Sequence, residues 1–199
     1  MARRKDQDAR RAQLAEATER AVLARGLEGL RLRDIAEEAD LTPAAVLYYG
    51  GLDRLVVETF QQAMERFCGE REAAAERAPD ARERMRACIE AGVATGPGDR
   101  LPRLLFEFWP RSLRDPAVAA MDSTLFERQV SIYYGALLLG REQGLFTLRE
   151  PARTIAACLV AMEDGFQTEI LAGRRTRTEV IAALHSYVHA MTGCDLGAA

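Results

Sequence analysis

Residues 32–49 read LRDIAEEADLTPAAVLYY, and this stretch decides the fold. Its apolar residues recur at helical spacing on both sides of a short break, which predicts two short helices joined by a tight turn. Ile35 is expected to point inward from the first helix, and Val46 from the second, together with Tyr49 or Leu47. Small, turn-forming and apolar positions in this order are typical of a helix-turn-helix.

The turn between the two helices carries two local signals. Asp40 lies where the chain leaves the first helix, and we expect a positive φ there, because Asp tolerates that conformation better than most residues. Thr42 and Pro43 then open the second helix as its N-cap and its first residue. The second helix is therefore expected to begin directly after the turn.

The second helix has the properties of an element that reads DNA. Its first residues are small, so its backbone can approach the major groove and contact a thymine methyl. Thr42 and the free amides at the helix start are natural phosphate ligands, and Tyr48 can donate to a phosphate. Basic residues at the start of the chain are expected to form a loose arm along the DNA. The predicted DNA contacts are Arg3, Arg4, Lys5, Arg31, Arg33, Thr42, Pro43, Ala44, Ala45, Tyr48 and Tyr49.

Positive charge is concentrated at one end of the chain. The 199 residues have a net charge of -3, yet residues 1–33 hold nine basic and five acidic side chains. An acidic chain can therefore still bind nucleic acid through this part. The four cysteines are far apart, which argues against zinc ribbons and redox dithiols. Because no apolar run could span a membrane and no signal peptide is visible, we expect a cytoplasmic protein that binds no membrane.

Helical periodicity continues through the rest of the chain. Long helices are expected over 116–143, 151–172 and 176–191, the last of them opened by a capping box. No segment alternates like a half-buried strand, so the predicted fold class is all-α. The composition changes near residue 55, which divides the chain into a basic unit, 1–55, and a larger helical body, 56–199.

Residues 11–60 resemble the DNA-binding domain of the tetracycline-repressor (TetR) family of bacterial regulators. Arg31 stands where threonine is common in that family, and Asp40 stands where glycine is usual. The run before the fourth helix is one residue shorter and lacks the family's lysine, so Arg54 is the expected substitute for its phosphate contact. The residues that carry the resemblance are Leu14, Ala17, Gly26, Asp34, Ile35, Ala36, Ala39, Leu41, Thr42, Val46, Leu47, Tyr48, Tyr49, Leu52, Asp53, Arg54 and Leu55.

The resemblance implies a three-helix head that reads DNA, joined by a fourth helix to a body that binds a small molecule and dimerises. The implied function is a ligand-responsive transcriptional regulator, a repressor that binds a palindromic operator as a homodimer and is released by an effector. Beyond residue 60 the likeness rests on architecture. Phe108–Trp109 and Arg114–Pro116 are similar to the body of choline-responsive and related members.

The middle helices are the predicted effector pocket. Aromatic residues cluster there with a few acids and amides, a combination that can hold an organic cation by cation–π attraction and charge. An apolar or neutral ligand remains an open alternative. The predicted pocket residues are Phe106, Trp109, Phe126, Gln129, Tyr133, Met162, Glu163 and Phe166.

The last two long helices are the predicted dimer interface. One helix-turn-helix reads one half-site, so a palindromic operator needs a two-fold dimer, and two helices from each chain would make a four-helix bundle. The same apolar stripes could instead face the core of their own chain. The predicted interface residues are Leu159, Ile170, Val180, Leu184, Tyr187 and Met191.

Two other functions were weighed against the regulator. A small all-α enzyme would need a catalytic motif, and the sequence contains no phosphate-binding loop, zinc-protease motif or nucleophile elbow. A helical adaptor would use its basic tail on a membrane or an acidic partner and would show no sequence-specific DNA binding. His185 and His189 have the spacing of metal ligands, but no third ligand lies near them in the sequence. We therefore expect no catalysis, no metal and no cofactor.

Overall fold

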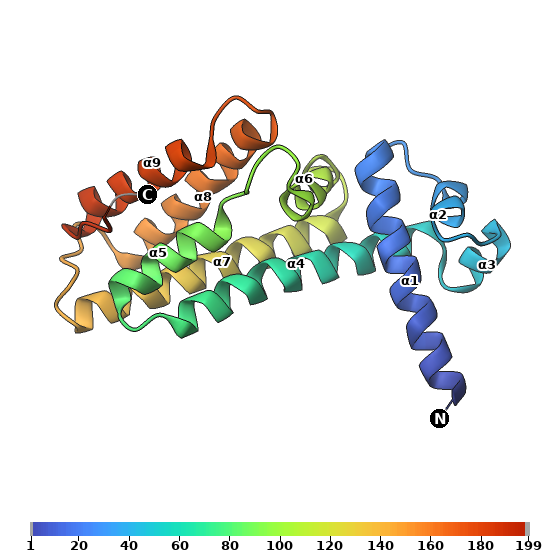
Figure 1. Ribbon diagram of the computed structural model, residues 1–199, viewed down its shortest axis with the longest axis horizontal. Coiled ribbons are helices and arrows are strands. Elements are labelled where there is room, and N and C mark those ends of the chain that lie inside the picture. The colour runs from blue at the N-terminus through green and yellow to red at the C-terminus, as the bar shows by residue number, and fades with distance from the viewer. Residues whose placement is uncertain (1, 198–199) are drawn as a thin grey trace. The chain divides into compact units, whose positions relative to one another are not determined.

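The protein is a bundle of α-helices. The structure is a computed structural model that describes residues 2–197, apart from the side chains of residues 2–8. This part contains nine helices and no strand, which confirms the predicted all-α class (Figure 1). The helices are α1 (Ala2–Arg25), α2 (Leu32–Glu38), α3 (Pro43–Tyr48), α4 (Gly51–Arg77), α5 (Ala81–Gly92), α6 (Arg100–Ser112), α7 (Pro116–Glu142), α8 (Ala152–Leu171) and α9 (Arg177–Thr192).

Local capping signals place several helix boundaries. The side chain of Asp80 accepts a hydrogen bond from the amide of Glu83 at the start of α5. Thr176 and Glu179 form the expected capping box at the start of α9. Gly26, with φ +73°, follows the last residue of α1. Because these signals act within one turn of the helix, the sequence alone predicts them.

The helices form two compact units. One unit contains the chain through Glu65 together with Arg103–Asp122, and the other contains Arg66–Pro102 together with the chain from Ser123 onward. In the core of the first unit, α1 buries Leu14 and Ala21, and α2 buries Ile35.

The second unit has a larger core, built from α5, α7, α8 and α9 and from the C-terminal part of α4. Within residues 2–197, no helix is both long enough and apolar enough to cross a membrane.

Candidate functional site

The stretch from α2 to α3 folds as the predicted helix-turn-helix. Ile35 and Val46 are completely buried, so each helix presents one apolar side chain to the interior. Ala36 is only 2% exposed, and its carbonyl accepts a hydrogen bond from the Leu41 amide at 2.9 Å, which closes the turn. Asp40 has φ +54°, as expected from its place after the first helix.

The outer face of α3 is open to solvent. Tyr48 and Leu47 are 79% and 63% exposed, while Tyr49 is half-buried and meets the ring of Tyr48 edge-on at 5.3 Å. The alternative that Leu47 points inward is therefore wrong, and Tyr49 takes the inward position beside Val46. Leu47 lies one turn beyond Ala44 on α3. The exposed face of α3 therefore includes Leu47, which is not among the predicted DNA contacts.

The start of α3 has the predicted N-cap, which determines which of its backbone amides is left to bind a ligand. The hydroxyl oxygen of Thr42 accepts a hydrogen bond from the Ala45 amide at 3.2 Å, and Pro43 occupies the first helical position. Thr42, Pro43 and Ala44 are exposed and Ala45 is half-buried. Because proline has no N–H and the Ala45 amide serves the cap, Ala44 supplies the amide best placed for a ligand at this end.

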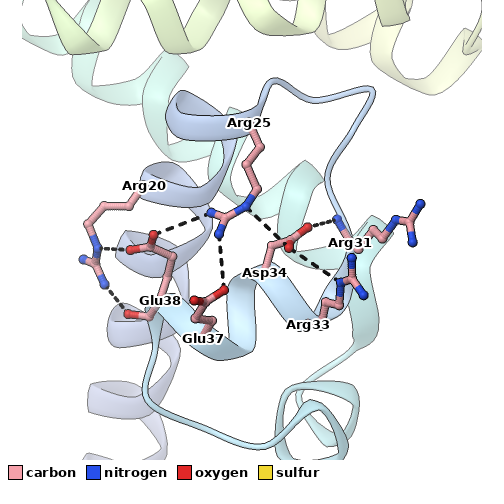
Figure 2. A network of polar contacts seen from close by, with 7 residues as sticks. All are labelled: Arg20, Arg25, Arg31, Arg33, Asp34, Glu37 and Glu38. Atoms are coloured by element: carbon pink, nitrogen blue, oxygen red, sulfur yellow. Dashed lines mark hydrogen bonds and ion pairs between the residues drawn. The ribbon is translucent and has the colours of Figure 1, made fainter.

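Arginines of α1 bind all three acidic residues of α2. Figure 2 shows Arg25 reaching between Asp34, Glu37 and Glu38, at distances of 3.4, 3.2 and 3.7 Å. Arg20 donates to both the carboxylate and the backbone carbonyl of Glu38. These contacts fix the orientation of α2 on α1 and neutralise the negative charge of α2.

The predicted basic DNA contacts differ in exposure and in how close their side chains lie to acidic residues of the protein. Arg31 is exposed, and its backbone amide donates to Asp34 at 2.8 Å (Figure 2). The side chain of Arg33 is 71% exposed and lies 3.9 Å from Asp34. Arg54 donates to Glu58 at 2.7 Å, so it must leave this partner to bind a phosphate.

The predicted loose arm is not what the backbone shows, because α1 begins at Ala2. Arg3, Arg4 and Lys5 belong to its first turn, and their side chains lie outside the described residues.

Helix α6 is attached to the helix-turn-helix unit by polar contacts. The carboxylate of Glu107 accepts a hydrogen bond from the Leu27 amide at 3.1 Å, directly after α1. Arg111 pairs with Asp53 at the start of α4, also at 3.1 Å. In the sequence Glu107 was one of several acids among aromatic residues, and no local pattern indicated its partner 80 residues away.

The predicted pocket residues are divided between the two compact units. Phe106 and Trp109 belong to the first compact unit, where their rings contact each other at 5.3 Å. Phe126, Met162 and Phe166 are half-buried and pack against the core of the second unit. The assignment of these five side chains to one ligand-binding set stays a prediction.

The three polar pocket residues do meet, around an arginine that the sequence analysis missed. Arg71 of α4 is completely buried, and its guanidinium donates to Gln129 at 3.1 Å and to Glu163 at 2.6 Å. The hydroxyl of Tyr133 donates to the other oxygen of Glu163. The signal was present, because Arg71 lies four residues beyond Phe67 and continues the apolar stripe of α4.

Burial and charge shape the ionisation of this cluster. Burial raises the pKa of Glu163, and the adjacent Arg71 opposes that rise. Burial and the charge of Glu163 together raise the pKa of Tyr133 well above its ordinary value, so its hydroxyl stays protonated. Burial favours the neutral form of Arg71, but the Glu163 carboxylate outweighs it and raises the pKa of Arg71. The cluster is therefore a buried ion pair with a neutral phenol.

Four of the six predicted interface residues are buried in their own chain. Leu159, Ile170, Val180 and Leu184 are at most 1% exposed and belong to the core of the second unit. They are thus unavailable to a partner, and the alternative that these stripes face their own core is the one observed. Tyr187 and Met191 are half-buried at the edge of that core.

The two histidines have separate environments. His185 is buried, with Nδ1 3.2 Å from the carbonyl of Gly197, whereas His189 is exposed. Among the residues whose placement is described, no three histidine, cysteine, aspartate or glutamate side chains are grouped to hold a metal ion.

Comparisons with known proteins agree with this arrangement. The family described as BetI-type transcriptional repressor, C-terminal, matches residues 81–193. A curated relative, the HTH-type transcriptional regulator BetI of Burkholderia cenocepacia, is 28% identical over 193 residues, which span 94% of this chain and 95% of the relative.

Solved structures show the same fold. A transcriptional regulator from Saccharomonospora viridis in complex with choline superposes with a TM-score of 0.84 at 22% identity, over 94% of this chain and 98% of the other. A TetR transcription regulator from Haloarcula marismortui superposes with a TM-score of 0.83 at 20% identity, over 93% and 99% of the two chains.

Proposed function

The chain belongs to the TetR family of transcriptional regulators, in which the BetI-type repressors match its residues 81–193, and on this premise we propose how its parts divide the work. It is a ligand-responsive DNA-binding repressor. Residues 1–55 bind double-stranded operator DNA. Residues 56–199 bind a small-molecule effector and pair with a second copy of the chain. Two copies place two α3 helices on a palindromic operator, roughly 34–36 Å apart.

The observation that supports DNA reading is the two-sided character of α3. Val46 is buried and anchors α3 to the core of its unit. Thr42, Ala44 and Tyr48 are exposed to solvent. Thr42, Tyr48 and the Ala44 amide bind phosphates, which positions the helix without selecting a sequence. Ala44 and Ala45 let the helix approach base edges and contact a thymine methyl, which selects a sequence.

Basic residues around the helix-turn-helix supply the electrostatic part of binding. Arg31 and Arg33 reach phosphates beside the groove, and Arg54 joins them after leaving Glu58. Arg3, Arg4 and Lys5 extend the contacts along the backbone. Each phosphate neutralised by an arginine or lysine releases counterions, so we expect binding to weaken steeply as salt increases.

The interface between two copies lies on the exposed sides of α8 and α9, which contact each other within one chain. Small residues at helical spacing cover both exposed sides, and small side chains let helices of two chains approach closely. Tyr187 and Met191 border this surface. The small exposed residues are Cys158, Ala161, Gly165, Ala182, Ser186 and Ala190.

The effector changes the spacing of the two α3 helices. A ligand can do so only if it binds two arrangements of the dimer with different affinity. Helix α6 is placed to transmit the change, because Glu107 and Arg111 connect it to the end of α1 and the start of α4. We propose that a change in the position of α6 pulls on both of these points.

Selection of bound fragments from random DNA tests the proposed function. The full chain is expected to enrich an inverted repeat with half-sites about one helical turn apart, centre to centre. Enrichment of no sequence, with binding that unrelated DNA abolishes, would leave a helical adaptor with a basic surface as the better account.

A further inference from the structure

The environment of Arg71 has the composition of a receptor for an organic cation. Its guanidinium carbon lies 5.4 Å from the ring centre of Phe67 and 5.0 Å from that of Tyr133. Glu163 supplies the negative charge and Gln129 a neutral acceptor. Two aromatic rings with one buried carboxylate are the groups that recognise free guanidinium and quaternary ammonium ions.

The chain fills this receptor with its own side chain. Arg71, Gln129, Tyr133 and Glu163 are all at most 4% exposed, so no bulk water reaches them. A Cβ added at Gly92 would lie 1.3 Å from the Arg71 guanidinium, which means that the glycine at the end of α5 leaves the room that the arginine occupies. Within the described part of the chain, Nε of Arg71 has no hydrogen-bond partner, although Nη1 and Nη2 both do.

A contribution to the free energy of folding is a weak explanation for the buried pair of Arg71 and Glu163. Removing two charges from water costs several kcal/mol per ion, and apolar residues of similar volume often stabilise a core as well or better. The two ring contacts and the missing Cβ at Gly92 are instead features of a site shaped around a planar cation. The same guanidinium would be held there if it arrived as a free ligand.

We propose that Arg71 is a tethered occupant of an organic-cation site in the second unit, and that it makes this protein unresponsive to free quaternary ammonium effectors. This inference rests on the proposed function, because it specifies which effectors the body rejects. The effector is then a compound that does not need the Glu163 carboxylate, which favours the apolar or neutral alternative over the organic cation.

Removing the tethered cation tests the proposal. Arg71→Ala leaves a space bounded by Phe67, Tyr133 and Glu163, and ethylguanidine restores the missing atoms, which are Cγ, Cδ and the guanidinium. The melting temperature of the full-length variant is expected to rise by about 5 °C or more at a saturating concentration, about 100 times the Kd. The wild type and Arg128→Ala, which loses a partly exposed ion pair with Glu72 between α7 and α4, are expected to show no such rise.

Two further probes separate recognition of a cation from the filling of a cavity. Choline is expected to stabilise Arg71→Ala, and 3,3-dimethyl-1-butanol, its uncharged isostere, is not. A folded variant that neither cation stabilises, or that the alcohol stabilises equally, would overturn the proposal. If Arg71→Ala does not fold, its refolding yield with and without ethylguanidine is the readout, and the same yield in both would overturn the proposal.

A measurement on the wild type needs no variant. Calorimetric titration with choline at millimolar concentration is expected to give no saturable heat, and saturable binding would overturn the proposal. The result of this titration does not depend on whether the protein binds DNA. If the selection experiment enriches no operator while Arg71→Ala still binds ethylguanidine, the proposed function fails and the assignment of Arg71 stands.

Discussion

Tyr48 is the most exposed large hydrophobic side chain in the described part of the protein, at 79% of its surface. An aromatic ring left in water on a six-residue helix contributes little to the core, and the proposed function assigns this side chain a phosphate contact. Thr42 and Ala44 share its face of α3.

Tyr48→Ala is expected to weaken operator binding about tenfold, or about 1.4 kcal/mol, while the free energy of unfolding stays within about 0.5 kcal/mol of the wild type. The loss should be similar on different sequences, since a phosphate contact carries no base information. Fluorescence anisotropy with labelled duplexes measures the first effect and urea denaturation the second. Tyr134→Ala, at a partly exposed tyrosine of α7, is the control. Unchanged affinity would remove Tyr48 from the interface.

Asp40 provides a second test, one of stability. Its φ of +54° favours Gly, Asn and Asp and is unfavourable for a β-branched side chain. Asp40→Val is therefore expected to lower the free energy of unfolding by about 1–2 kcal/mol, whereas Asp40→Gly should change it by less than about 1 kcal/mol. Thermal unfolding followed by circular dichroism compares the two. Equal effects would mean that the turn does not depend on this conformation.

Residues with local partners were predictable, and residues with distant partners were not. Thr42 caps the amide three positions further on, and Asp40 acts through its own φ, so both roles follow from the sequence. Arg71 pairs with Glu163, 92 positions further on, and no local pattern indicates this contact. The sequence did show an arginine on an apolar stripe, which is itself a signal of a buried charge that needs a partner.

Among the elements, α4 and α7 are joined by an ion pair near the surface. Arg128 of α7 donates to both oxygens of Glu72 of α4, at 2.7 and 2.8 Å. The hydrogen bonds from Arg128 lower the pKa of Glu72. The pair is partly exposed, so its contribution to stability is small compared with that of a buried pair.

The lowered pKa of Glu72 predicts a pH dependence. The folded state binds this proton less readily than the unfolded state, so the stabilisation is present above the unfolded pKa, about 4.3, and is lost as the pH falls through the folded pKa. Glu72→Gln is expected to cost up to about 1 kcal/mol at pH 7 and almost nothing at about pH 3. Urea denaturation at both pH values measures the difference. A cost that does not change with pH would contradict the assignment.

Helix boundaries were mostly predicted, while the faces of the helices were not. Capping side chains act within the first turn of a helix, so α3 and α9 begin where the sequence indicates. In α8 and α9 the apolar stripe is the inward face, and small residues such as Ala161 and Ala182 are part of the exposed surface. Hydrophobic spacing alone cannot tell a stripe that packs within one chain from one that packs between two chains.

For the whole molecule, the account requires a dimer formed by the exposed sides of α8 and α9. Ala161→Arg places a charged side chain on that surface and is expected to raise the dimer dissociation constant at least about tenfold, because an unpaired charge is costly to bury. Ala117→Arg, the same substitution at an exposed alanine of α7, should leave it unchanged. Sedimentation velocity at several concentrations measures both. A stable dimer of Ala161→Arg would place the interface elsewhere.

The division of the chain at residue 55 stays a prediction. The compact units follow contacts rather than chain order, and residues 103–122 belong to the same unit as the helix-turn-helix. A change in composition marks where a basic segment ends, but it does not reveal that a distant helix returns to contact it. The contacts of Glu107 and Arg111 are of this long-range kind.

The central claim is that two copies of α3 read the operator, and selection from random DNA with Ala44→Gln tests it most directly. A longer polar side chain at this position can reach a base edge that alanine cannot. The account predicts a changed base preference at one or two positions, repeated symmetrically in both half-sites of the enriched sequence. An unchanged sequence, or a change in one half-site alone, would contradict it.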